Sequence, residues 1–203
     1  MKTVSFDDRA DWDAYRIGKI GGSRLGDIMP KRAGAGKKMA FYELIAERLG
    51  VPAEQEVPME RGTRLEPEAL QEFEKLTGKV VDKSLKIWVS DINPSITCSP
   101  DGTIADDTEA CEVKCLSSAR HIQAIIENEI PDDYMPQARQ YFVANEKLQT
   151  LHFIMYDPRI VAKPMIVFEL HRADMEVDIQ TALAFELQTL NEVDEWVAKL
   201  TNY

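Results

Sequence analysis

The hydrophobic pattern of this chain changes its period near residue 78, and that change limits the available folds more than any other feature. Before it, residues 60–77 carry Leu65, Leu70 and Phe73 at the three-to-four spacing of an amphipathic helix. Beyond Gly78 the apolar residues come in short runs separated by turn residues, which predicts short strands. We expect these strands at 80–81, 85–89, 96–98, 103–104 and 110–115.

The remainder of the chain predicts helices and strands in alternation. Helices are expected at about 118–129 and 133–145, strands at about 149–156 and 164–171, and a long helix at about 174–200. This order predicts an α/β (α+β) fold with a mixed central β-sheet flanked by helices. Because 203 residues suffice for one generous domain, we expect a single domain over 1–203, with the last helix as an appended element.

The charge balance narrows the class of partner. Lys and Arg number 24 against 35 Asp and Glu, a net charge of −11, whereas nucleic-acid coats and membrane-surface binders usually need a basic surplus. Residues 172–203 alone hold seven acidic residues against two basic ones. The basic stretch 31–38 lies elsewhere. An acidic exterior with a local basic path suits an enzyme that contacts DNA over a confined surface.

Several features indicate a cytoplasmic protein without membrane contact. No run approaches the roughly 18–20 apolar residues of a membrane span, and the N-terminus lacks the apolar core of a signal peptide. The cysteines form no CxxC pair and the three histidines have no zinc spacing, so we expect free thiols and no structural zinc. These cysteines are Cys98, Cys111 and Cys115.

The stretch from Ser99 to Lys114 is the most informative for chemistry. Side chains alternate along a strand, so Glu112 and Lys114 share one face and the apolar or small Cys111, Val113 and Cys115 share the other. The turn signal Asp101-Gly102 allows a hairpin that brings Asp101 beside Glu112. Such a strand has an apolar back and a carboxylate–ammonium pair in front.

Two carboxylates and a lysine are a minimal set for hydrolysing a phosphodiester. Mg²⁺ prefers oxygen ligands and usually takes one or two carboxylates, which leaves positions for water and phosphate. The metal lowers the pKa of bound water, and a nearby lysine orients that water and stabilises the transition state. Taken alone, the triple of Asp101, Glu112 and Lys114 also fits a surface hairpin with a solvated Glu–Lys pair.

Other residues point in the same direction, and each has a plainer interpretation beside it. Glu66 lies near the apolar face of its helix, although a helix-flank glutamate before proline would look the same. Gln137 and Tyr141 are four apart on one helical face, which also suits a polar flank packed under the sheet. Arg16 and Ser23 flank a glycine-rich turn that is able to hold phosphate or to serve as a simple connector.

In combination, five motifs resemble those of the family of phage lambda exonuclease and YqaJ-type viral recombinases, in the PD-(D/E)xK nuclease superfamily. The resemblance covers residues 11–156, and the ordered set is far more specific than any single motif. The motifs are Arg16-Ile-Gly-x-Ile-Gly-Gly-Ser23, Arg61-Gly-x-x-Leu-Glu66-Pro, Ser99-Pro-Asp101-Gly, Glu112-Val-Lys114 and Gln137-x-x-x-Tyr141.

The resemblance implies a restriction-endonuclease-like core and a Mg²⁺-dependent 5′→3′ exonuclease. Such an enzyme digests one strand of linear double-stranded DNA to mononucleotides and leaves 3′ single-stranded DNA for phage-type recombination. The resemblance also implies two Mg²⁺ ions per active site, with Mn²⁺ as a substitute. It further implies a homotrimeric ring and a single-strand annealing protein as partner, in a phage or prophage context within the bacterial cytoplasm.

The resemblance also implies roles for individual residues. Asp101 and Glu112 match metal ligands, with the Val113 carbonyl as a further one, and Lys114 matches the residue that activates water. Glu66 matches an additional acidic residue near the metals, and Gln137 one that positions the nucleophile. The residues matched to the 5′-phosphate or to DNA are Arg16, Ser23, Ser99, Tyr141 and Met59, the last as an apolar wedge.

Two alternatives remain from the sequence. An endonuclease of the same superfamily would share Asp101, Glu112 and Lys114, but it would not need a pocket for a 5′-phosphate. A catalytically idle module that binds DNA ends would be signalled by loss of a metal ligand, and none of these positions is lost.

Overall fold

The structure is a computed structural model that describes residues 10–11, 14, 17, 39–51 and 58–201. Two predicted site residues, Arg16 and Ser23, and the basic stretch 31–38 lie outside the described residues. The elements are α3 (Met39–Arg48), α4 (Pro58–Thr77), β1 (Trp88–Val89), β2 (Thr97–Cys98), β3 (Gly102–Ile104), β4 (Glu109–Lys114), α5 (Ser118–Glu127), the 3₁₀ turn η1 (Asp132–Tyr134), α6 (Met135–Ala144), β5 (Thr150–Tyr156), β6 (Met165–His171) and α7 (Arg172–Thr201).

The main sheet has four strands in the order β3-β4-β5-β6. The pairs β3–β4 and β5–β6 are antiparallel, whereas β4 and β5 are parallel and are connected through α5, η1 and α6. A parallel pair needs such a long crossover, and this one supplies the helices that cover one face. The expected mixed central sheet flanked by helices is therefore confirmed.

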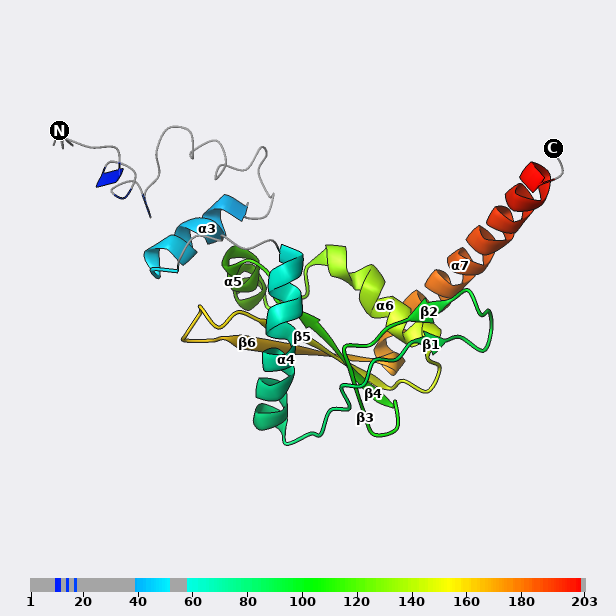
Figure 1. The fold of residues 1–203 in the computed structure, drawn as a ribbon, viewed down its shortest axis with the longest axis horizontal. Coiled ribbons are helices and arrows are strands. Elements are labelled where there is room, and N and C mark those ends of the chain that lie inside the picture. The colour runs from blue at the N-terminus through cyan, green and yellow to red at the C-terminus, as the bar shows by residue number, and fades with distance from the viewer. Residues whose placement is uncertain (1–9, 12–13, 15–16, 18–38, 52–57, 202–203) are drawn as a thin grey trace.

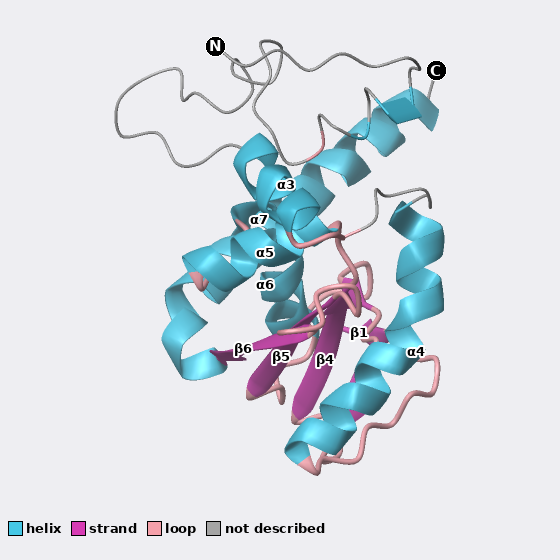
Figure 2. Ribbon diagram, turned by 90° about the vertical axis from the view of Figure 1, so that its left-hand side faces the viewer, coloured by secondary structure: helices cyan, strands magenta, loops and turns pink. Residues whose placement is uncertain are grey.

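Helices cover both faces of this sheet (Figures 1 and 2). The helix α4 packs on one face, where Leu70 and Phe73 join Ile154 of β5 in an apolar cluster. On the opposite face, α6 and α7 pack against alternate β5 residues such as Phe153 and Met155. The strict alternation along β5 divides the core into two layers, as side chains on successive strand residues require. The C-terminal half of α7 runs away from the sheet (Figure 1).

The helices match their predicted ranges closely, with local reasons for the differences. Asn128 adopts a left-handed conformation (φ 53°) and ends α5 two residues before the predicted boundary. The predicted helix 133–145 begins as the 3₁₀ turn η1, and α6 starts with Pro136 in its first turn, where the missing N–H costs nothing. No helix in the described part of the chain is long and apolar enough to cross a membrane.

The first two predicted strands are shorter than the pattern indicated. Residues 80–81 form no strand, and the segment makes only an isolated bridge between Asp82 and Thr103. Of residues 85–89, only Trp88 and Val89 pair with β2. The reason is that Lys86 holds this segment through its side chain, which donates to Asp82 at 2.9 Å and to Thr103 at 2.8 Å. Side-chain bonds replace the backbone ladder there.

Candidate active site

The hairpin of β3 and β4 brings Asp101 beside β4. Gly102 pairs with Cys111, so Asp101 lies opposite Glu112, and its Oδ2 accepts a hydrogen bond from the Val113 backbone N–H at 2.7 Å. Gly102 also lets Val81 pack directly against the hairpin, because a Cβ at residue 102 would lie 2.4 Å from Cγ1 of Val81. The predicted proximity of the two carboxylates is confirmed.

Glu112 is the best-anchored acidic side chain of the site. It is only 1 % exposed and faces α6, while its strand neighbours Cys111 and Val113 pack toward α4. Gln137 donates to Glu112 Oε1 at 2.9 Å, and the Tyr141 hydroxyl donates to Oε2 at 2.5 Å. A buried carboxylate is costly unless its oxygens are hydrogen-bonded, and α6 supplies two of the donors. The predicted common face of Gln137 and Tyr141 is confirmed.

Lys114 lies on the same face of β4 as Glu112. Its ammonium group donates to Glu112 Oε1 and lies 5.6 Å from the ring centroid of Tyr134, within the range of a cation–π contact. Tyr134 is not among the site residues predicted from the sequence. The available signal was its position three residues before Gln137, at the start of the same helical segment.

Three carboxyl groups, those of Asp101, Glu112 and Glu66, lie near a single ammonium group, that of Lys114. Burial, together with the nearby Glu112 carboxylate, raises the pKa of Asp101 to about 7. Burial and the same Glu112 charge also raise the pKa of Glu66, which projects from α4 and is half-buried. The Lys114 ammonium opposes both shifts. Crowded, partly buried carboxylates favour the binding of a cation, and such perturbed groups cluster at functional sites.

The donor set fits a hard divalent cation that shares its ligands with solvent and substrate. Among the described residues, no three His, Cys, Asp or Glu side chains are grouped so as to hold a metal ion by themselves. Mg²⁺ needs only one or two carboxylates from the protein, and Asp101 and Glu112 are two oxygen donors set side by side. The roles of these residues and of the Val113 carbonyl in metal binding stay predictions.

The residues predicted to contact DNA have different outcomes. Ser99 is exposed, and its hydroxyl donates to the Lys86 carbonyl at 3.1 Å. Met59 lies in the first turn of α4, and its side chain is outside the description. Tyr141 is fully buried, with its hydroxyl on Glu112 and its ring against Trp88. Its hydroxyl thus holds the Glu112 carboxylate, and its expected contact with DNA stays a prediction.

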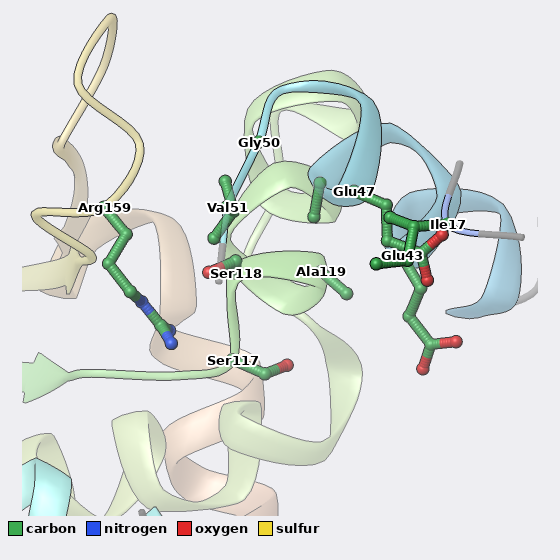
Figure 3. Close-up of a pocket in the computed structure, with 10 residues that line it drawn as sticks. Ile17, Glu43, Glu47, Gly50, Val51, Ser117, Ser118, Ala119 and Arg159 are labelled. Carbon is green, nitrogen blue, oxygen red and sulfur yellow. The ribbon is translucent and has the colours of Figure 1, made fainter. Parts of the chain in front are cut away.

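A separate pocket of about 560 Å³ lies where α3 meets the start of α5 (Figure 3). Ser117 at its wall caps α5 by accepting a hydrogen bond from the Arg120 backbone N–H at 3.4 Å. None of the described residues predicted for the site lines this pocket. The pocket is lined by Ile17, Glu43, Ala46, Glu47, Gly50, Val51, Ser117, Ser118, Ala119 and Arg159.

This chain resembles known nucleases in sequence and in structure. The YqaJ-like viral recombinase domain matches residues 11–147. The alkaline exonuclease LHK-Exo from Laribacter hongkongensis has a similar structure, with a TM-score of 0.62, 27% identity, and coverage of 96% of this chain and 98% of the other. The same values hold for LHK-Exo in complex with dAMP. A phage-related exonuclease from Haemophilus somnus 129PT matches with a TM-score of 0.42 and 14% identity, over 84% and 94% of the two chains.

The fold is that of the lambda-exonuclease-like PD-(D/E)xK nucleases, which confirms the expected fold class. The chain belongs to the YqaJ-like viral recombinase family. No curated protein matches it.

Proposed function

We propose that this protein is a Mg²⁺-dependent exonuclease that digests one strand of linear double-stranded DNA in the 5′→3′ direction. It releases mononucleotides and leaves 3′ single-stranded DNA for recombination. The observation that carries the proposal is the juxtaposition of Asp101, Glu112 and Lys114 on one hairpin, in a chain of a viral recombinase family. The resemblance to LHK-Exo adds support, because that protein is an alkaline exonuclease and one of its structures holds a mononucleotide, dAMP.

The residues of the chain divide the chemistry between them. Asp101 and Glu112 hold Mg²⁺, with the Val113 carbonyl as a further ligand, and Glu66 adds negative charge beside them. When bound, the metal supplies an activated water and neutralises charge that builds up on the phosphoryl oxygens. Lys114 orients the attacking water and stabilises the transition state through its charge. Gln137 and Tyr141 fix the orientation of Glu112 through the hydrogen bonds described above.

The proposed preference for a 5′ end rests on Ser99 and on the sequence matches of Arg16, Ser23 and Met59 to phosphate-binding and DNA-binding residues of the family. Ser99 lies two residues before Asp101 and is exposed, so its hydroxyl is accessible to a terminal phosphate. Arg16 and Ser23 complete the proposed phosphate pocket, with Met59 as the wedge at the end base pair. We expect 5′-phosphorylated linear duplex to be digested faster than duplex with 5′-hydroxyl ends. Equal initial rates on the two substrates would contradict the pocket.

Assembly and context complete the proposal. The enzyme forms a homotrimeric ring, works with a single-strand annealing protein, and acts in the cytoplasm of a bacterial host. A ring encloses the duplex, so the acidic exterior does not need to hold the DNA.

One digestion experiment separates the proposal from its alternatives. Linear and closed-circular duplex are incubated with the protein in Mg²⁺, Mn²⁺ or EDTA, and products are resolved by size. The proposal predicts mononucleotides from linear duplex only, and none in EDTA. Nicking of the circle would indicate the endonuclease, and intact but retarded linear DNA would indicate the idle end-binding module.

The variant Lys114→Ala tests the chemical role in the same assay. We expect it to bind linear duplex like the wild type and to lose cleavage by about 10²–10³-fold, as is typical when one preorganised group that stabilises the transition state is removed. Lys147→Ala, at an exposed position in the loop after α6, is the matched control. Cleavage by Lys114→Ala at the wild-type rate would overturn the assignment.

A further inference from the structure

A buried arginine of α4 donates hydrogen bonds to the backbone just beyond the end of β4, and none of the proposed catalytic or binding roles involves it. Arg61 lies in the first turns of α4 and is only 3 % exposed. Its Nε and one terminal nitrogen donate to the same acceptor, the backbone carbonyl of Cys115, at 3.1 and 2.6 Å. A guanidinium is costly to bury, so a sequence that keeps one inside the fold commonly uses its fixed geometry.

The acceptor is the residue directly after Lys114. The ladder between β4 and β5 ends with the pair Lys114 and Met155, so Cys115 is the first residue beyond it. The sheet therefore holds the backbone up to Lys114 and no further. The two bonds from Arg61 fix the next carbonyl, which sets the direction in which the strand leaves Lys114.

Arg61 also connects two parts of the proposed active site. Glu66 is five residues further along the same helix, and Lys114 precedes the carbonyl that Arg61 holds. Burial is the largest cause of the lowered pKa of Arg61; Arg159 lowers this pKa further, and Asp157 opposes the shift. Asp157 in turn accepts from Ser118 at 2.5 Å, at the start of α5. The end of β4 is thus tied to α4 through Arg61, and the start of α5, three residues after Cys115, is tied to the residue that follows β5.

We propose that Arg61 is a positioning residue, which holds the end of β4 against α4 so that Lys114 and Glu66 keep a fixed separation. It touches neither substrate nor metal and acts through the Cys115 carbonyl. The expected effect of Arg61 on kcat rests on the proposed function. The expected effect of Arg61 on the backbone at the end of β4 rests on the geometry alone. The two consequences are measured separately.

The structural measurement uses two cysteines of β4 and its continuation as reporters. Cys115 and Cys111 are both free and buried in the layer under α4. Native protein is treated with a thiol-alkylating reagent, and labelling of each cysteine is followed by mass spectrometry. In Arg61→Met we expect Cys115 to label at least about tenfold faster, while Cys111 keeps its wild-type rate. General loss of stability would instead accelerate both cysteines together.

The kinetic measurement separates turnover from DNA binding. In Arg61→Met we expect kcat to fall by about 10–100-fold, because a misplacement of about 1 Å caused by a remote change costs up to about 10²-fold, with KM for linear duplex changed less than about threefold. Arg61→Lys keeps a donor for the Cys115 carbonyl, so its kcat should lie between those of the wild type and Arg61→Met. Lys75→Met, at an exposed position near the end of the same helix, should match the wild type in both measurements.

Each outcome is informative. Unchanged kcat in Arg61→Met, or a rise in labelling shared equally by Cys115 and Cys111, would overturn the proposal. If the wild-type protein cleaves no DNA, the proposed function fails, and the labelling experiment still decides whether Arg61 fixes the end of β4.

Discussion

At the residue scale, the site depends on how one buried carboxylate is satisfied. Glu112 is enclosed by donors from α6 and by the Lys114 ammonium, and these bonds leave it in a defined orientation. Burial, followed by the nearby Glu112 charge, raises the pKa of the Tyr141 hydroxyl well above its ordinary value, so Tyr141 stays a donor. A fixed carboxylate is what metal-assisted hydrolysis needs, because misplaced ligands lose much of the rate.

Replacing Tyr141 by phenylalanine tests this arrangement. The ring stays in the core, but one oxygen of Glu112 loses its donor, which typically costs about 1–3 kcal/mol at a buried site. We expect the free energy of unfolding in urea to fall by that amount and kcat to fall by about 10–100-fold. Tyr156→Phe is the matched control, because its hydroxyl donates to Glu68 on α4, away from Glu112. Equal kcat in the two variants would contradict a role for Tyr141 in holding Glu112.

Part of this residue arrangement was predictable from the sequence. Strand alternation placed Glu112 and Lys114 on one face, and the Asp-Gly turn placed Asp101 opposite, since both follow from backbone geometry. The spacing of Tyr134 from Gln137 was a signal that it lies near the site, but the burial of Tyr141 and the distance of Tyr134 from Lys114 were not predictable. Both depend on how closely α6 packs on the sheet, and no local spacing encodes that distance.

At the element scale, the hairpin β3–β4 fits only because Gly102 lets the chain before β3 approach closely. We expect Gly102→Ala to lower the free energy of unfolding in urea by about 1–3 kcal/mol, since the new Cβ would overlap Val81. Val81→Ala removes the overlapping methyl groups. The double variant should therefore be more stable than the sum of the single effects predicts. Strict additivity of the two changes in the free energy of unfolding would show that overlap with Val81 does not cause the destabilisation by Gly102→Ala.

Sequence patterns predict the ends of the helices in this chain better than the extent of its first strands. Helix ranges were predicted within a few residues, because caps and prolines act locally, as at Asn128 and Pro136. Residues 85–89 are predicted as a strand, yet Leu85 and Ile87 face solvent and only Trp88 and Val89 pair with β2. Backbone pairing in the rest of this segment is replaced by side-chain bonds from Lys86 that span up to 21 residues in sequence. Contacts of that range cannot be read from a local period.

At the scale of the whole molecule, one buried histidine makes stability depend on pH. His121 on α5 is fully buried, and its Nε2 lies 2.9 Å from the Lys163 carbonyl. Burial lowers its pKa below the ordinary 6.5, against the opposing effects of the Lys163 carbonyl and Asp157, while Arg159 and the Lys163 charge lower it slightly further. The folded protein therefore keeps this ring neutral where the unfolded chain would protonate it.

The sign of the effect follows from the direction of the shift. The contribution of His121 is fully present above about pH 6.5 and is lost as the pH falls toward the lower folded-state pKa. We expect the free energy of unfolding in urea to fall more steeply between pH 7 and pH 5 in the wild type than in His121→Gln. The difference is at most about 1.4 kcal/mol per pH unit, the limit for one proton. Parallel pH profiles would contradict the assignment.

The proposed ring is a property of the whole assembly, and its mass is the direct test. A ring closes only when each subunit presents two different complementary patches, so that head-to-tail contacts end after a fixed number of copies. The projecting C-terminal half of α7 lies in an acidic segment, and the basic stretch 31–38 lies in another part of the chain. We expect light scattering to give three times the mass of the 23.0 kDa chain, whereas a single monomeric species at working concentrations would contradict the ring.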